Sequence, residues 1–135
     1  MNTPRNIIAI DRCRADQLIG LRAVDASHVV ISEQTPWTPI PIQIPARMTL
    51  SEKVESGVRL YSTQLQFRTC GDPRDHGRWG YRCKTADGRH LLVGTDGRPF
   101  PVSSVTTNHP DNMTDSQLHE VSVTFTSARK TPEIL

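Results

Sequence analysis

The sequence predicts a mainly β fold: a single-domain antiparallel sandwich or barrel with one or two short helices. Three observations indicate this class. His119–Thr126 alternates apolar and polar residues and is rich in valine and threonine, which is typical of a half-buried strand. Turn signals such as Asp87-Gly88 and Asp96-Gly97 recur at the spacing of a sandwich or barrel. No segment carries an apolar stripe over three or more helical turns.

Further strands are expected where apolar and β-branched residues gather between turns. The longest has an apolar phase that changes between Leu60 and Leu65, which predicts a bulge or a bend near Ser62–Thr63. In chain order the expected strands are Asn6–Ile10, Leu18–Ala23, His28–Ser32, Val58–Arg68, Trp79–Thr85, Arg89–Gly94 and Phe100–Thr106.

The dipeptide Asp87-Gly88 predicts a tight hairpin, because both residues tolerate the positive φ of a two-residue loop. That loop places Cys83 opposite Leu92 and Tyr81 opposite Gly94. Further along, Pro99 and Pro101 lack an N–H donor, so the strand that follows is expected to begin at an edge or in a loop.

Two windows predict helical turns. Thr49 and Glu52 have the spacing of a capping box, and Gly57 offers a stop, so Met48–Gly57 is expected to hold one or two turns. The polar window Asp111–Leu118 is the second candidate.

Composition sets limits on function. The chain has 135 residues, with 16 Lys plus Arg and 14 Asp plus Glu, for a net charge of +2. This balance argues against a polyanion-coating protein or an acidic mimic. No apolar run approaches the roughly 18 residues of a spanning helix. Charged residues from Asp11 to Asp16 interrupt the start where a signal peptide needs an apolar stretch. We therefore expect no membrane partner and a cytoplasmic location.

The three cysteines are Cys13, Cys70 and Cys83, and an odd number favours free thiols in a reducing compartment. Strand alternation points Cys70 and Cys83 to opposite faces, which argues against a disulfide. A metal site would need Cys70, His76, Cys83 and His90, whose gaps of five, six and six residues lack the close pairs of structural zinc sites. We expect neither metal nor cofactor.

Catalytic patterns are weak. Asp11, Cys13 and Asp16 form a short polar cluster, but Arg12 and Arg14 between them favour a solvated loop. His109 has Ser104 and Asp111 nearby in sequence, yet a triad is defined by spatial geometry. No nucleophile elbow, P-loop, dinucleotide fingerprint or HExxH motif is present. The sequence favours a non-enzymatic protein, with a hydrolase or metal enzyme that uses the Cys/His set as a rival.

Arginines outnumber lysines thirteen to three, and Arg68–Arg98 interleaves them with Trp79 and Tyr81. Arginines and aromatic rings on a sheet can bind single-stranded nucleic acid, which is the alternative function. Because acids occupy the same turns and the net charge is near zero, a solvated β surface is favoured.

Residues 36–45 contain four prolines and an alternating row of isoleucines at Ile40, Ile42 and Ile44. The prolines exclude a helix and a central strand. Three interpretations stay open: a polyproline ligand for an aromatic groove, an arm that packs on a neighbouring subunit, or an edge connection across the protein's own core.

A resemblance covers about the last 80 residues. Glu52–Leu65, Gly88–Gly94, Arg98–Pro101 and the alternating strand Val121–Thr126 resemble small structural proteins (tail or head–tail) from tailed-phage and prophage cassettes. The resemblance implies a non-enzymatic virion component that self-associates, and it carries over no catalytic or binding residue. It also implies a location in the host cytoplasm before assembly and in the virion afterwards.

Together these observations predict a non-catalytic assembly module that acts by subunit contacts. Its partners are expected to be itself, as a homo-oligomer, or other virion proteins. The expected contact residues are Trp37, Ile40, Ile42 and Ile44 in the arm, and Arg74, Arg78 and Trp79 at the loop tip.

Overall fold

The computed structural model has β-strands as its main secondary structure, which confirms the mainly β class. It describes residues 3–25, 27–43, 46–69, 78–95, 100–107, 119–129 and 131–134. The longer strands are β1 (Thr3–Arg14), β5 (Ala46–Glu55), β6 (Val58–Thr69), β7 (Trp79–Thr85), β9 (Val102–Thr107) and β10 (His119–Ser127). The shorter strands are β2 (Arg22–Ala23), β3 (His28–Val30), β4 (Thr38–Ile40), β8 (His90–Val93) and β11 (Glu133–Ile134). Within these ranges the helical content is one 3-10 turn, η1 (Ala15–Gln17).

All described strands belong to one open sheet. Its order is β2-β3-β11-β8-β7-β1-β5-β6-β10-β9, and β4 pairs with β1 beside this path. The pairings between described strands are antiparallel, except that β3 and β11 run parallel. The arrangement is sandwich-like, because the sheet folds over on itself.

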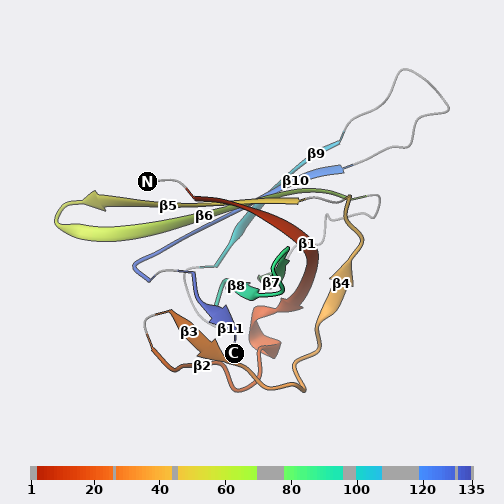
Figure 1. Cartoon of the computed structure of the whole chain (residues 1–135), viewed down its shortest axis with the longest axis horizontal. Helices are drawn as coiled ribbons and strands as arrows, with labels where there is room; N and C mark the ends of the chain where they lie inside the picture. The colour runs from red at the N-terminus through yellow and green to blue at the C-terminus, as the bar shows by residue number, and fades with distance from the viewer. Residues whose placement is uncertain are drawn as a thin grey trace.

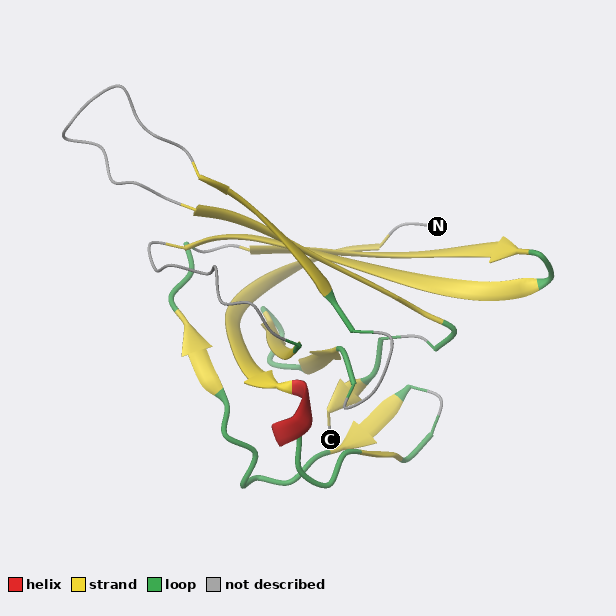
Figure 2. Ribbon diagram, turned by 180° about the vertical axis from the view of Figure 1, so that it is seen from behind, coloured by secondary structure: helices red, strands yellow, loops and turns green. Residues whose placement is uncertain are grey.

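Strand β1 connects the two layers of this folded sheet. Thr3–Ile7 pairs with β5, whereas Ile7–Arg14 pairs with β7. The register with β7 shifts between Ile7 and Ala9, and such an irregularity bends a strand. Figure 1 shows β1 curving from the layer of β5 and β6 down to β7 and β8, and Figure 2 shows the same two layers from behind.

The core lies between the inner faces of these layers. Met48, Leu65 and Val123 enter it from β5, β6 and β10, and Ile10 and Cys83 enter from β1 and β7. Each of the five is at most 1% exposed. Burial of a large aliphatic side chain contributes roughly 1.5–3 kcal/mol, so this double row is a main source of stability.

The predicted helix at Met48–Gly57 is wrong, because that window forms most of β5 and the turn into β6. Its residues pair with β6 from Arg47↔Gln66 to Glu55↔Val58. The intervening Ser56 and Gly57 both have positive φ, 52° and 78°, as a two-residue hairpin turn requires. Gly57 is therefore part of the turn of a β-hairpin, and it does not end a helix.

The predicted bulge near Ser62–Thr63 is also wrong. Strand β6 pairs without a register break with both β5 and β10. Thr63 takes an inward position in phase with Leu65, and its hydroxyl bonds the hydroxyl of Thr131. Leu60 and Leu65 differ in phase because Leu60 lies on the face of β6 that points away from the core.

The β7–β8 hairpin differs from its predicted register by one residue. Cys83 lies opposite Leu91 and Tyr81 opposite Val93, because the loop has three residues instead of two. Gly88, with φ of 91°, closes this loop by donating its N–H to the Thr85 carbonyl at 3.0 Å. A glycine with positive φ at the end of a three-residue loop is a common hairpin solution.

The segment after β1 packs against the outside of the second layer. Of the predicted strand Leu18–Ala23, only Arg22–Ala23 forms a strand, β2. Leu18 directly follows η1, and its side chain is buried, with 7% exposed. A Cβ at Gly80 would lie 3.2 Å from Leu18 Cδ1, so the glycine leaves room for this leucine. The Ile19 N–H donates to buried Thr35 Oγ1 at 3.3 Å, which anchors the segment.

Some expectations fall outside the described residues, namely the Asp96-Gly97 turn and the helical turn at Asp111–Leu118. In the part of the chain that is described, no helix combines the length and apolar character needed to cross a membrane.

Candidate interaction surfaces

Trp79 sits at the start of β7 beneath two arginines of β1. The antiparallel register places Arg14 opposite Trp79 and Arg12 opposite Tyr81, so all four share one face. The guanidinium carbon lies 4.2 Å from the indole centroid for Arg12 and 4.8 Å for Arg14. Such distances are typical of cation–π contacts. The ring of the predicted contact residue Trp79 is therefore in contact with Arg12 and Arg14 of the same chain.

The predicted contact residue Arg78 is exposed, and its guanidinium carbon lies 4.9 Å from the ring centroid of Phe100. Its carbonyl accepts the Ala15 N–H at 2.7 Å, which ties η1 to the start of β7. Arg74, predicted for the same loop tip, lies outside the described residues.

Trp37 lies near the opposite face of β7, where Arg82 and Asp11 also meet. The guanidinium carbon of Arg82 is 4.9 Å from the Trp37 ring centroid. Arg82 Nη2 and Nε donate to Asp11 Oδ2 at 2.8 and 3.1 Å. Asp11 is therefore an ion-pair partner, and not a free carboxylate beside Cys13.

The Pro/Ile segment forms an edge connection on its own domain. Strand β4 pairs with β1 from Ile10↔Ile40 to Arg12↔Thr38, and Ile40 and Ile42 are partly buried against the core. Ile44 lies outside the described residues. For the described part of this segment, the structure agrees with the third interpretation, an edge connection across the protein's own core.

The thiols of Cys13 and Cys83 are free and buried. Burial, with a smaller contribution from the charge of Asp16, raises the pKa of Cys13 above its usual value. Burial also raises the pKa of Cys83, with a smaller contribution from Asp11. Raised pKa values leave both thiols protonated at neutral pH and weakly nucleophilic.

The other candidate metal ligands and catalytic residues either lie apart from one another or fall outside the described residues. Cys70, His76, His109 and Asp111 lie outside the described residues, and Ser104 is exposed on β9. His90 is half-buried on β8, and no group of three or more Cys, His, Asp or Glu side chains that could hold a metal occurs within the described ranges.

The residues of the nucleic-acid alternative do not form an open stacking platform. Tyr81 is 5% exposed inside the core, and burial raises its pKa. Trp79 carries two guanidinium groups over its ring. A nucleobase would have to displace those arginines to stack on Trp79.

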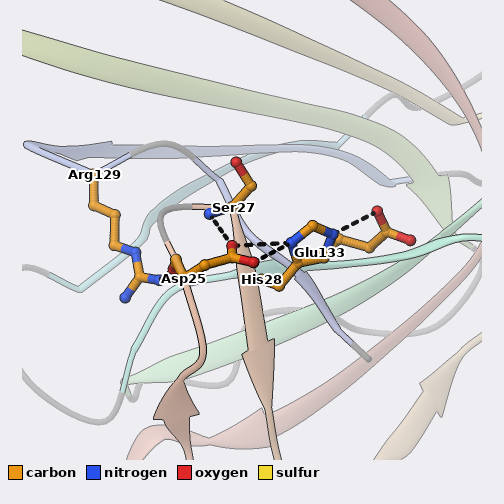
Figure 3. Close-up of polar contacts among 5 residues, drawn as sticks. All are labelled: Asp25, Ser27, His28, Arg129 and Glu133. Carbon is orange, nitrogen blue, oxygen red and sulfur yellow. Dashed lines mark hydrogen bonds and ion pairs between the residues drawn. The ribbon is translucent and has the colours of Figure 1, made fainter.

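A polar cluster that the sequence did not reveal fastens the C-terminal segment (Figure 3). His28 lies between two carboxylates, with Nδ1 2.9 Å from Asp25 Oδ1 and Nε2 3.7 Å from Glu133 Oε2. Arg129 Nη2 donates to the Asp25 carbonyl at 2.6 Å. The Ser27 N–H and His28 together lower the pKa of Asp25. The local signal was the Asp-x-Ser spacing of an Asx turn, but nothing local pointed to residues 100 positions away.

A cavity of about 220 Å³ opens beside this cluster. Arg129 is the one ionisable residue among those that line it, and the others are mainly apolar. This lining offers no acid–base pair. The lining residues are Leu21, Ala23, Val29, Leu92, Gly94, Thr95, Phe125, Ser127, Arg129 and Pro132.

The most exposed part of the described chain is the outer end of the β5–β6 hairpin. Residues 52–59 are all exposed, and Figure 1 shows the hairpin extending past the two-layer body on one side. Val54 is 66% exposed and Val58 is 51% exposed. The sequence prediction missed this feature because it assigned the window to a helix.

No family model, curated protein or solved structure matches this chain. The functional proposal therefore rests on the surfaces of the protein, which include a projecting hairpin and an exposed sheet edge. The thiols of Cys13 and Cys83 are buried, and Arg12, Arg14 and Arg82 contact side chains of their own chain.

Proposed function

We propose that the protein is a non-catalytic assembly module that acts through contacts between subunits, in a phage-like particle of the kind its sequence resembles. The observation that supports this proposal is the projecting tip of the β5–β6 hairpin, residues 52–59, with two exposed valines. This tip takes the role that the sequence suggested for the Pro/Ile arm, because Ile40 and Ile42 contribute to the protein's own core.

An isolated two-stranded ribbon is marginally stable in water, and a partner surface would stabilise it. The register places Val54 opposite Arg59, on the face that continues from the core, and Val58 opposite Glu55 on the other face. Each face of the tip therefore presents one β-branched apolar side chain. A neighbour that covers either face removes apolar area from water.

The charges of the tip are balanced within it. Arg59 Nη1 lies 3.3 Å from Glu52 Oε1, and Lys53 Nζ lies 3.4 Å from Glu55 Oε2. Exposed ion pairs of this kind contribute little to stability. Their effect is that two copies of the tip, or the tip and another surface, can approach without strong repulsion.

Size-exclusion chromatography with light scattering tests this proposal on the full chain. We expect a mass above that of the monomer, rising with concentration, and a lower mass for Val54→Lys/Val58→Lys with the β-rich circular dichroism spectrum retained. Thr126→Lys, at an exposed position of β10 inside the sheet, is the matched control and keeps the wild-type mass. A wild-type monomer at high micromolar concentration contradicts the proposal, and so does a double variant with wild-type mass.

A further inference from the structure

Strand β9 forms one end of the sheet, and its outer edge has no strand beside it among the described residues. Its one described pairing is with β10, from Val102↔Thr124 to Thr107↔His119. Figure 1 shows this pair at the opposite side of the body from the β5–β6 tip. An exposed strand edge offers a row of backbone donors and acceptors to another strand.

Two other edge strands are protected in the usual ways. Strand β2, at the far end of the path, has only two residues. Strand β4 contains Pro39 and is flanked by Pro36 and Pro41. Short edges and prolines both discourage edge-to-edge pairing. Strand β9 is six residues long and contains no proline, and Pro101 lies just before its first residue.

The composition of β9 also favours pairing. Its sequence is Val-Ser-Ser-Val-Thr-Thr, without a charge or a proline. Val102 is 69% exposed, and Ser103 and Ser104 are exposed as well. Valine and threonine are among the residues most enriched in strands. By contrast, the two strands next in the sheet carry charges such as Glu120 and Arg68.

We propose that the occupant of this edge is β9 of a second copy, which runs antiparallel and joins the two sheets across a two-fold axis. This inference rests on the proposed function, since it assigns one contact of the same self-assembly. In a two-fold pair of identical antiparallel strands, the residue at the axis faces its own copy, so a charge at that position would meet a like charge. The absence of charge at all six positions means that no register of self-pairing brings like charges together.

The symmetry limits the register. A two-fold axis perpendicular to the sheet keeps both core faces on one side, so residues of the same alternation phase lie opposite each other. Centred on Ser104, the pair places Ser104 opposite Ser104, Val102 opposite Thr106, and Ser103 opposite Val105. The half-buried Val105 then extends the core side of the joined sheet.

Introducing a charge at Ser104 tests the pairing directly. The background is Val54→Lys/Val58→Lys, which removes the hairpin contact and is expected to leave a dimer. In that background, Ser104→Lys and Ser104→Glu should each give a monomer by light scattering, because like charges meet across the axis. An equimolar mixture of the two should recover the dimer, with at least a tenfold gain in association. Thr126→Lys in the same background should remain dimeric.

The outcomes separate the two proposals. If the wild type assembles but the hairpin background is monomeric, or if both Ser104 variants stay dimeric, the β9 inference is overturned and the hairpin proposal stands. If the wild type is a monomer at every concentration, self-assembly itself is overturned. A dimer that forms in the mixture, but in neither single variant, supports the two-fold β9 pair. Pairing with a strand of another protein, or unfolding of the variants, would not restore a dimer on mixing.

Discussion

Arg82 and Asp11 lie directly opposite each other on β7 and β1, and two guanidinium nitrogens of Arg82 reach one carboxylate oxygen of Asp11. Both side chains are less than a third exposed, and Trp37 lies against the same guanidinium. This cluster therefore connects two strands, β1 and β7, with the proline-rich segment that leads into β4.

Replacing Arg82 by alanine should destabilise the fold. We expect a loss of about 1–2 kcal/mol, because the charge-assisted bonds and the stacking on Trp37 disappear together. Urea unfolding measures this change. Arg89→Ala, which removes an exposed pair with Asp87, is the control and should cost less than about 0.5 kcal/mol. Equal losses for the two variants would contradict the role given to Arg82.

Leu65→Ala should be among the most damaging substitutions. Leu65 is fully buried between the layers, and truncation of such a leucine costs about 2–5 kcal/mol. Leu60→Ala, half-exposed in the hairpin's outer part, should cost under about 1 kcal/mol. Denaturant unfolding of both variants checks this. A larger effect at Leu60 would mean that the inward face of β6 is assigned incorrectly.

The buried thiols should make the protein sensitive to alkaline pH. The folded pKa values of Cys13 and Cys83 lie above their unfolded values, so both states keep the protons below the unfolded pKa of about 8.5. As pH rises beyond it, the unfolded state loses protons first, and the free energy of unfolding falls. Unfolding by urea should therefore occur at lower concentration at pH 10 than at pH 7.5.

Thiol labelling separates this cause from general alkaline effects. With Cys70→Ser to remove the third thiol, we expect negligible labelling of the folded protein at pH 8 and two labels per chain in denaturant. Rapid labelling of either cysteine in the folded state would be inconsistent with the burial described above.

Binding to single-stranded nucleic acid should be absent. Tyr81 is buried and the Trp79 ring is covered by Arg12 and Arg14, so no described ring offers an open stacking face along β7. Fluorescence anisotropy with labelled oligonucleotides at low salt should show no change. Binding that weakens steeply with salt would support the nucleic-acid alternative instead.

Strands with a clear local pattern were predictable from sequence. Trp79–Thr85 coincides with β7, and His119–Thr126 falls within β10, because alternation and β-branched residues agree there. The window of β5 was mistaken for a helix because Thr49 and Glu52 happen to have capping-box spacing. The inward alternation of Ala46 and Met48 was the better signal, and pairing with β6 decides the outcome.

Other features depend on contacts that no local pattern encodes. The register of β8 was ambiguous because Leu91, Leu92 and Val93 are all buried, so alternation does not mark a single inward face. The parallel pairing of β3 with β11 joins segments about 100 residues apart. The exposed valines of the β5–β6 tip follow from the length of that hairpin relative to the body, which is a property of the whole sheet.

Hydrogen exchange of the wild-type chain at low and high protein concentration tests self-assembly through exposed strands most directly. We expect slower amide exchange at high concentration in residues 102–107 and 52–59, with no change in β7. Exchange rates in those two segments that are the same at every concentration would contradict this expectation.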